Sequence, residues 1–359
     1  MKPDTGLQLL RVQNLRCLDS VELEADAAQN IIVGTNGAGK TSILEAIFFL
    51  GRGKTFRPGQ PSTLVQENKD AFTIFGDISL ESAEHRLGIS HGRSGLQIHY
   101  DGQGNASLAD LAAALPVQII DPEVHQLIQG GPKGRREYID WGVFHVKHDF
   151  LHAWRRYRRA LKQRNAALKQ GQPKQAVTAW DSELIESGLE IDVARSQFVE
   201  DLLPLLSSIS IELLQYSSNC IYHRGWLEDE SFPDALSASW ERDCTYGSTQ
   251  VGPHRAELQI QSDDQPVRHR LSRGQQKLLS IALVLAQSIF VAKTLKRKVT
   301  LLVDEPAAEL DEEHLRRLMD ILGCEELQLF ISTLDLDTLP VTGPSRVFHV
   351  ERGVLSTLI

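Results

Sequence analysis

A glycine-rich stretch near the N-terminus has the residues needed to hold phosphate groups. Residues 34–41, "GTNGAGKT", match the pattern G-x-x-x-x-G-K-[ST] at every position, between an apolar strand-like run and an apolar helix-like run. The glycines let the backbone curl so that its N–H groups point at phosphate oxygens, and the following helix adds the positive end of its dipole. The alternative is a glycine-rich turn with an incidental lysine. The complete match favours ATP binding, with Lys40 at the β- and γ-phosphates and the Thr41 hydroxyl on Mg²⁺. The predicted ATP-binding residues are Gly34, Thr35, Asn36, Gly37, Ala38, Gly39, Lys40, Thr41 and Ser42.

A pair of carboxylates follows a second apolar run late in the chain. In "TLLVDEP", Asp304 and Glu305 end a predicted strand. At the carboxyl edge of a parallel sheet, Asp304 could hold Mg²⁺ through water and Glu305 could accept a proton from the attacking water. A lone pair of this kind is often only a solvated strand end. With a phosphate-binding loop upstream, the pair predicts ATP hydrolysis, with Lys40 and Glu305 as the catalytic residues.

The stretch "LSRGQQ", from Leu271 to Gln276, precedes a long apolar helix-like run. Taken alone, a serine that caps a helix is the more common explanation. Together with the other two motifs, the stretch resembles the L-S-G-G-Q signature of ABC-type ATPases, although Arg273 replaces the first glycine. The resemblance implies that Ser272, Arg273, Gly274 and Gln275 bind the γ-phosphate of ATP held by a partner protomer. It also places Asp311, in "AAELD", at the family's usual dimer contact.

A basic segment lies in the middle of an acidic chain. The chain has 359 residues and a net charge of −9, yet residues 131–170 hold eleven Lys and Arg against three acids. Such a segment can steer a polyanion to one face. Arg155, Arg158, Arg159 and Lys162 follow the spacing of one helical face. We predict phosphate contacts with DNA there, without strong sequence specificity; the alternative is a solvated helix face.

The sequence predicts strands towards both ends of the chain and helices in its middle. Strand-like runs surround the glycine-rich stretch and the two carboxylates, whereas residues 138–214 have a mostly helical pattern. We therefore predict an α/β fold, an ABC-type ATPase head with a mixed sheet around the phosphate-binding loop and a second, mainly helical lobe. The predicted ATP-binding lobe I comprises residues 1–118 and 296–359. Lobe II, residues 119–295, carries a helical arm and the signature stretch.

The composition is typical of a cytoplasmic protein without a membrane partner. Four scattered cysteines show no C-x-x-C pair, which predicts neither a zinc site nor a disulfide framework. The N-terminus lacks the apolar core of a secretory signal. The most apolar run, residues 278–292, is shorter than the roughly 18 residues of a spanning helix, so we expect a buried core helix.

Nearly the whole chain resembles the RecF family of bacterial replication and repair proteins, short relatives of the SMC-type ATPases without their long coiled coil. The matching blocks are "NLRCLDSVEL", "GTNGAGKTSILEAI", "LGRGKTFR", "GGPKGRREYIDWGVFHV", "GSTQVGPHRAEL", "LSRGQQKLLSIALVLAQ" and "LLVDEPAAELD". The segments "RREYIDWGVFH" and "GPHR" are far more specific than the ATPase motifs, which many families share.

This resemblance implies a protein of recombinational repair and replication that dimerises on ATP and binds double-stranded DNA near single-strand gaps. It would help to load RecA recombinase together with other recombination mediators, and weak ATP hydrolysis would reset it. Two positions depart from the ABC pattern. The usual glutamine at the lobe junction is not evident, because Gln118 lies inside a predicted strand and the corner is Asp121–Pro122. Thr333 stands where the switch histidine is expected.

Three other functions remain to be weighed. A transporter ATPase subunit would have a more compact head, and the long basic insertion argues against it. A nuclease-associated SMC relative would normally add a domain with a cluster of acidic metal ligands, and we find no such domain in the sequence. The intact Asp304–Glu305 pair disfavours a purely structural binding module.

Overall fold

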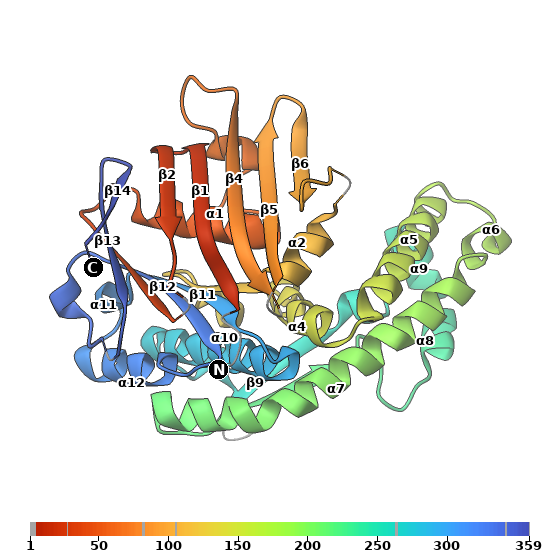
Figure 1. The fold of residues 1–359 in the computed structure, drawn as a ribbon. Coiled ribbons are helices and arrows are strands. Elements are labelled where there is room, and N and C mark those ends of the chain that lie inside the picture. The colour runs from red at the N-terminus through yellow and green to blue at the C-terminus, as the bar shows by residue number, and fades with distance from the viewer. Residues whose placement is uncertain are drawn as a thin grey trace. The chain divides into compact units, whose positions relative to one another are not determined.

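The computed structural model describes residues 5–26, 28–80, 83–104, 106–262, 265–341 and 343–358. The chain divides into two compact units, residues 1–124 with 288–359 and residues 125–287. The first unit contains two sheets and the second is mainly helical (Figure 1). This arrangement confirms the predicted α/β class, a mixed sheet around the phosphate-binding loop with a helical insertion.

The first sheet of the sheet-rich unit is antiparallel. Its strand order is β2-β1-β4-β5-β6, as Figure 1 shows. Alternating buried and exposed residues in β2, such as buried Val21 and Leu23 against exposed Ser20 and Glu22, show that one face packs on the core. The strands are β1 (Gly6–Leu15), β2 (Leu18–Glu24), β4 (Ala71–Leu80), β5 (Ala83–Gly92) and β6 (Gly95–Tyr100).

The second sheet is mostly parallel and has the order β14-β13-β3-β12-β11-β7. Every residue of β11 and β12 is buried, as expected for strands covered on both faces. Because β3, β12, β11 and β7 run in the same direction, their carboxyl ends meet at one edge. The strands are β3 (Gln29–Val33), β7 (Val117–Ile120), β11 (Val299–Asp304), β12 (Leu327–Thr333), β13 (Arg346–Glu351) and β14 (Val354–Thr357).

Helix α1 (Lys40–Arg52) lies in the core between these sheets. It contacts β1, β4 and β5 of the first sheet and β7, β11 and β12 of the second. Its side chains are apolar on most sides, and Phe49 packs edge-on against Phe72 of β4 at a centroid distance of 5.2 Å. The same unit contains η1 (Pro61–Leu64), α2 (Leu108–Ala114), α11 (Pro306–Glu309), α12 (Glu312–Leu322) and η4 (Leu336–Thr338).

The second unit is built around a helical hairpin. Figure 1 shows α5 and α7 side by side, and they share the most extensive helix–helix contact of the described structure. A small sheet, β10-β9-β8, completes the unit. Its elements are α3 (Gln126–Gln129), α4 (Pro132–Val146), α5 (Phe150–Lys169), α6 (Lys174–Thr178), α7 (Asp181–Leu214), β8 (Asn219–His223), α8 (Phe232–Ala238), α9 (Trp240–Tyr246), η2 (Pro253–Arg255), β9 (Glu257–Ser262), β10 (Gln265–Pro266) and η3 (Val267–His269).

Helix α10 (Arg273–Leu295) has residues in both units and contains the apolar run noted in the sequence. It is long and apolar enough to cross a membrane, but 78% of its most apolar stretch is already buried inside the protein. Burial of this kind is typical of a core helix, as predicted.

Candidate nucleotide site and nucleic-acid interface

The phosphate-binding loop joins β3 to α1 and depends on its glycines. Gly37 and Gly39 adopt φ angles of 77° and 120°, which side chains other than glycine rarely allow. A Cβ atom on Gly34 would lie 2.4 Å from the carbonyl oxygen of Val350. The loop therefore owes its shape to the motif itself, and α1 begins at Lys40 with its first turn facing the loop.

Lys40 is held inside this loop. Its Nζ donates hydrogen bonds to the carbonyl oxygens of Gly34 at 2.7 Å and Thr35 at 3.1 Å. It also lies 3.0 Å from Oε1 of Glu305, and only 3% of the lysine side chain is exposed. The positive charge thus sits among backbone oxygens of the loop and the carboxylate that follows β11.

Thr41 and Asp304 come together although 263 residues separate them. The Thr41 hydroxyl donates to Oδ1 of Asp304 at 3.1 Å, and Ser332 donates to the same oxygen at 2.6 Å. Burial raises the pKa of Asp304, and the hydrogen bonds from Ser332 and Thr41 oppose this rise. A hydroxyl and a carboxylate oxygen are the hard donors that Mg²⁺ prefers. The pair predicted to hold Mg²⁺ therefore fits that ion.

Glu305 is placed by an unusual backbone conformation. Its φ and ψ are 51° and 52°, the left-handed region, which costs energy for a residue other than glycine. Its N–H donates to the hydroxyl of Ser332 at 2.9 Å and to the carbonyl oxygen of Ser332 at 3.2 Å. The carboxylate is 27% exposed, so it can reach both Lys40 and water.

The sequence did not single out Ser332, although it contacts both acids. Ser332 lies on β12, between the strand that leads to the loop and the strand that ends at Asp304. The sequence signal was a polar residue near the end of the apolar run "LQLFISTL". Recognising it required the strand order, because β12 follows β11 in the chain but lies between β11 and β3 in the sheet.

Asp121 is a further acid at this edge. It follows β7, whose Ile120 pairs with Val303 of β11, so Asp121 and Asp304 end neighbouring parallel strands. Burial raises the pKa of Asp121 to about 6, and the charge of Asp304 adds to the rise.

Gln118 is buried within β7, as the sequence indicated. The Thr333 hydroxyl bonds to the carbonyl oxygen of Asp335 at 2.9 Å.

The signature stretch forms a helix cap at the start of α10. The N–H of Gln275 donates to Oγ of Ser272 at 3.3 Å, and the N–H of Ser272 donates to Oε1 of Gln275 at 3.0 Å. Ser272 thus caps α10, as the alternative explanation of this stretch predicted. A Cβ atom on Gly274 would meet nothing within 4 Å, so the fold of this chain gives no steric reason for glycine at that position. Ser272, Arg273, Gly274 and Gln275 are all exposed.

Asp311 also caps a helix. Its Oδ1 accepts a hydrogen bond from the N–H of His314 at 3.0 Å at the start of α12, and its Oδ2 lies 2.7 Å from Nδ1 of the same histidine. These hydrogen bonds lower the pKa of Asp311, so its carboxylate remains charged and exposed.

Three arginines of the basic segment are neutralised by acids elsewhere in the second unit. Arg135 forms a double hydrogen bond with Glu257, at 2.6 and 2.7 Å. Arg164, only 1% exposed, contacts Asp181 at 2.8 Å and Asp243 at 2.6 Å. Arg156 bonds to acids of α7, namely Glu183, Glu186 and Glu190. The net charge counted over residues 131–170 therefore overstates the charge available to a ligand.

The four predicted DNA-contacting residues behave differently. Arg155, Arg158, Arg159 and Lys162 are all exposed on α5, and none forms an ion pair with another described residue. At 100° per residue they lie opposite the buried face that contains Tyr157, Ala160 and Arg164. Arg158 also stacks over Trp154 at 4.6 Å. The structure thus brings these four cations together on one solvent-facing surface.

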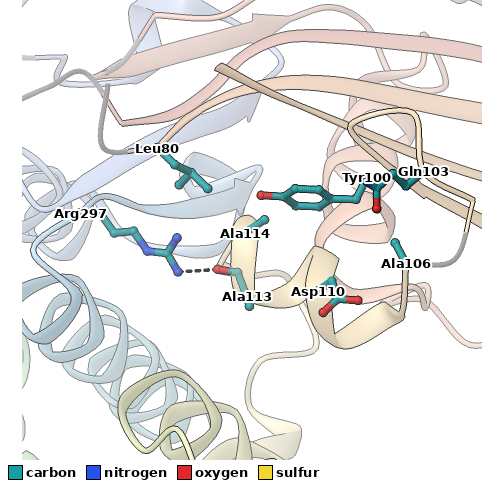
Figure 2. A pocket seen from close by; sticks show the side chains of 8 residues that line it. All are labelled: Leu80, Tyr100, Gln103, Ala106, Asp110, Ala113, Ala114 and Arg297. Carbon is teal, nitrogen blue, oxygen red and sulfur yellow. Dashed lines mark hydrogen bonds between the residues drawn. The ribbon is translucent and has the colours of Figure 1, made fainter. Parts of the chain in front are cut away.

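A pocket in the sheet-rich unit lies apart from all of these residues. Its volume is about 540 Å³, and Figure 2 shows Tyr100 and Arg297 on its walls, with the Arg297 guanidinium hydrogen-bonded to the carbonyl oxygen of Ala113. The other lining residues are Leu80, Gln103, Ala106, Asp110 and Ala114. No residue predicted to bind ATP, Mg²⁺ or DNA lines this pocket.

Residues 6–355 match the family described as RecF/RecN/SMC N terminal domain. The chain is 41% identical to the DNA replication and repair protein RecF of Thioalkalivibrio sulfidiphilus, over 97% of this chain and 98% of that protein. It is also 41% identical to the DNA replication and repair protein RecF of Azotobacter vinelandii, over 97% of each chain.

Solved structures give the same result for the fold. A structure described as the recombination mediator protein RecF with ATP in the RecFOR pathway superposes with a TM-score of 0.89 at 26% identity, covering 99% of this chain and 98% of that one. An Smc head domain from Pyrococcus furiosus has a TM-score of 0.61 at 17% identity, covering 99% of this chain and 96% of that one, and shows likeness of fold alone.

Proposed function

This chain belongs to the RecF family of DNA replication and repair proteins, and we propose that it is an ATP-dependent DNA-binding protein of recombinational repair and replication. The observation that carries the proposal is the assembly of the phosphate-binding loop, Asp304 and Glu305 at one edge of a parallel sheet. ATP binding would belong to the sheet-rich unit, predicted as lobe I. The helical arm and the signature stretch would belong to lobe II.

In the proposed hydrolysis, the loop N–H groups and Lys40 hold the β- and γ-phosphates. Glu305 accepts the proton of the attacking water, and its backbone N–H is fixed by Ser332 so that the carboxylate faces the loop. Thr41 and Asp304 would hold Mg²⁺, which supplies positive charge against the phosphate oxygens when bound. Hydrolysis would be slow and would reset the protein after DNA binding.

ATP would also join two protomers. Ser272, Arg273, Gly274 and Gln275 are exposed at the N-terminus of α10, and the space around Gly274 would let a phosphate from outside the chain approach the backbone closely. Asp311 would lie in the contact between the heads. The ligand of this surface would be the γ-phosphate of ATP bound to a second copy of the chain.

The exposed cations of α5 would follow the backbone of double-stranded DNA. Arg155, Arg158, Arg159 and Lys162 supply phosphate contacts, which position a protein on DNA but do not specify sequence. Together with other mediator proteins in the cytoplasm, the ATP-bound dimer would bind beside single-strand gaps and help to load RecA. The solved RecF structure described in a RecFOR pathway supports this setting.

The sequence alternatives receive less support. The replication and repair relatives match nearly the full chain, which disfavours a transporter subunit and a nuclease-associated ATPase. The contacts among Lys40, Thr41, Asp304 and Glu305 disfavour a purely structural module.

The decisive experiment measures the affinity of a fluorescent gapped duplex at fixed salt, with and without ATP. Two variants form a matched pair, because Ser272→Asn and Ser272→Asp both cap a helix and differ in charge. The aspartate would repel a γ-phosphate, so we expect it to abolish ATP-dependent dimerisation and the ATP-dependent gain in DNA affinity. The asparagine variant should retain part of both. Equal behaviour of the two variants, with ATP-independent DNA binding, would contradict the proposed dimer.

A second comparison tests the DNA face. Changing Arg155, Arg158 and Arg159 together to Glu should abolish duplex binding while ATP binding persists, because all three are exposed and outside the nucleotide site. Thermal unfolding of the variant would establish that it remains folded. Unchanged DNA affinity in a folded variant would refute the assignment.

A further inference from the structure

Several arginines surround one tight turn of the second unit. The turn η2, in the segment "GPHR", presents its carbonyl groups and Arg255 beside α4 and α7. Arg195 of α7 donates to the carbonyl oxygen of Pro253 at 2.7 Å, and Arg136 of α4 donates to the carbonyl oxygen of Ala256 at 2.8 Å. Arg255 is exposed, and its guanidinium donates to Oε1 of Gln250 at 3.0 Å.

These arginines differ in how their charges are balanced. Arg195 forms two hydrogen bonds with the carboxylate of Asp140, at 2.8 and 3.0 Å. Arg136 and Arg255, by contrast, form no ion pair with any described residue. Burial lowers the pKa of Arg136, and the charges of Arg195 and Arg255 lower it further, against the opposite effect of Glu257 and Asp140. Arginine nevertheless keeps its proton, so the fold retains a partly buried cation beside other cations.

The fold itself does not require both of these charges. The bond from Arg136 to a carbonyl oxygen, and that from Arg255 to an amide, need a hydrogen-bond donor but not a cation. Holding an unneutralised, half-buried guanidinium costs free energy unless an anion supplies the missing charge. Such perturbed groups concentrate at functional sites. We infer that Arg136 and Arg255 form a binding site for a phosphate group on the surface beside η2.

The turn that carries Arg255 is held in place by hydrogen bonds of its histidine. His254 accepts a hydrogen bond at Nδ1 from the Tyr157 hydroxyl at 2.6 Å, and its Nε2–H donates to the carbonyl oxygen of Thr249 at 3.0 Å. Gly252 has a φ of 123°, and a Cβ atom there would meet the Tyr157 hydroxyl at 2.7 Å. A guanidinium on such a support is held ready for its ligand, which lowers the entropy cost of binding.

The phosphate could come from a nucleic-acid backbone or from a nucleotide. Tyr157, which anchors the turn, lies on the face of α5 opposite the proposed DNA contacts, so the η2 site would be a phosphate contact separate from that face. For a DNA phosphate, the inference rests on the proposed function and adds a second contact point on the same unit.

The test measures how duplex affinity depends on salt for the full-length chain. Each phosphate contact contributes about 0.9 to the slope of log affinity against log salt concentration. Arg255→Gln is the first variant, because Arg255 is exposed and its replacement should leave the fold intact. Arg136→Lys keeps the charge but removes the planar guanidinium. The control is Arg316→Gln, which removes an exposed charge from α12 of the other unit.

We expect Arg255→Gln to weaken duplex binding roughly tenfold and lower the salt slope by about one. Arg136→Lys should weaken binding because the planar guanidinium is lost, but it should leave the slope unchanged because the charge is kept. Arg316→Gln should change neither quantity. Affinity for a fluorescent ATP analogue should be unaltered. Loss of ATP-analogue binding with an unchanged DNA slope would instead identify a nucleotide phosphate as the ligand. If both variants bind duplex and analogue as the unaltered chain does, the phosphate site is refuted.

The α5 variant separates this inference from the proposed function. If the triple Glu change on α5 abolishes duplex binding while Arg255→Gln and Arg136→Lys have no effect, DNA binding stands and the η2 site fails. If none of these variants affects duplex binding, both are contradicted.

Discussion

Nζ of Lys40 lies 3.0 Å from Oε1 of Glu305, so the cation of the phosphate-binding loop and the acid after β11 form an ion pair. The lysine is also bonded to two carbonyl oxygens of its own loop. One side chain thus contacts both the proposed phosphate cradle and the proposed general base. The phosphate-binding loop and the acidic pair therefore belong to one site.

Glu305→Gln should stop hydrolysis without preventing ATP binding. An amide cannot accept the proton of the attacking water, and general-base catalysis typically contributes about 10²- to 10⁴-fold. Removing the carboxylate also frees Lys40 to meet phosphate oxygens, so ATP affinity should stay equal or increase. Phosphate release and equilibrium nucleotide binding measure the two effects. Glu312→Gln, an exposed change on α12, is the control. Hydrolysis at the unaltered rate would exclude Glu305 as the base.

Ser332→Ala should slow hydrolysis about tenfold with little change in KM for ATP. The serine hydroxyl donates to Asp304 and accepts from the N–H of Glu305, so its loss leaves both acids less well positioned. The expected stability cost is about 1–2 kcal/mol, as for one buried hydrogen bond. Steady-state kinetics and urea denaturation measure these effects.

The neighbouring Thr333→Ala is its matched control. The Thr333 hydroxyl bonds within its own turn, to the carbonyl oxygen of Asp335, and not to either acid. Hydrolysis should therefore remain near that of the unaltered protein. An equal loss in both variants would show that Ser332 has no special positioning role.

Two arginines of α5 should give opposite results when changed. Arg164→Met leaves Asp243 buried without its cation, which should cost about 3–5 kcal/mol of the free energy of unfolding. Arg159→Gln should change stability by less than about 0.5 kcal/mol, because Arg159 is exposed, but should weaken DNA binding. Urea denaturation and duplex titration distinguish the two. A stable Arg164→Met variant would refute the structural role of that arginine.

Acid should destabilise the protein through His254. Burial lowers the pKa of His254 to about 4 from an ordinary value of 6.5. Between these two pH values, the unfolded chain binds a proton at this histidine and the folded chain does not. Stability from this group is complete above pH 6.5 and is lost as the pH falls from 6.5 towards 4. The loss is on the order of 3 kcal/mol at pH 4.

Urea denaturation at several pH values measures this loss. A His254→Gln variant, less stable at pH 7, should show a shallower decline between pH 6.5 and 4, because glutamine does not titrate. An identical pH profile in the variant and the unaltered chain would assign the acid sensitivity to other groups.

The sequence by itself determined the local parts of the site. The loop of residues 34–41 follows from glycines and a lysine at fixed spacing, and α1 follows from the apolar residues after it. The carboxylates at 304 and 305 are recognisable because they end an apolar strand. The exposed face of α5 was visible because its cations recur at helical spacing. Each of these features depends on neighbours within one or two turns of chain.

The tertiary structure alone decided which distant residues meet. Strand order β3-β12-β11-β7 brings Ser332 and Asp121 to the edge that holds Asp304, although β7 lies far from β11 and β12 in the chain. It also decided which cations remain available, since Arg164 is neutralised by Asp243 while Arg136 faces no carboxylate close enough to pair with it among the described residues. Charge and hydrogen bonding act through space, so a count along the chain could not separate the arginines that hold the fold together from those free to bind a ligand.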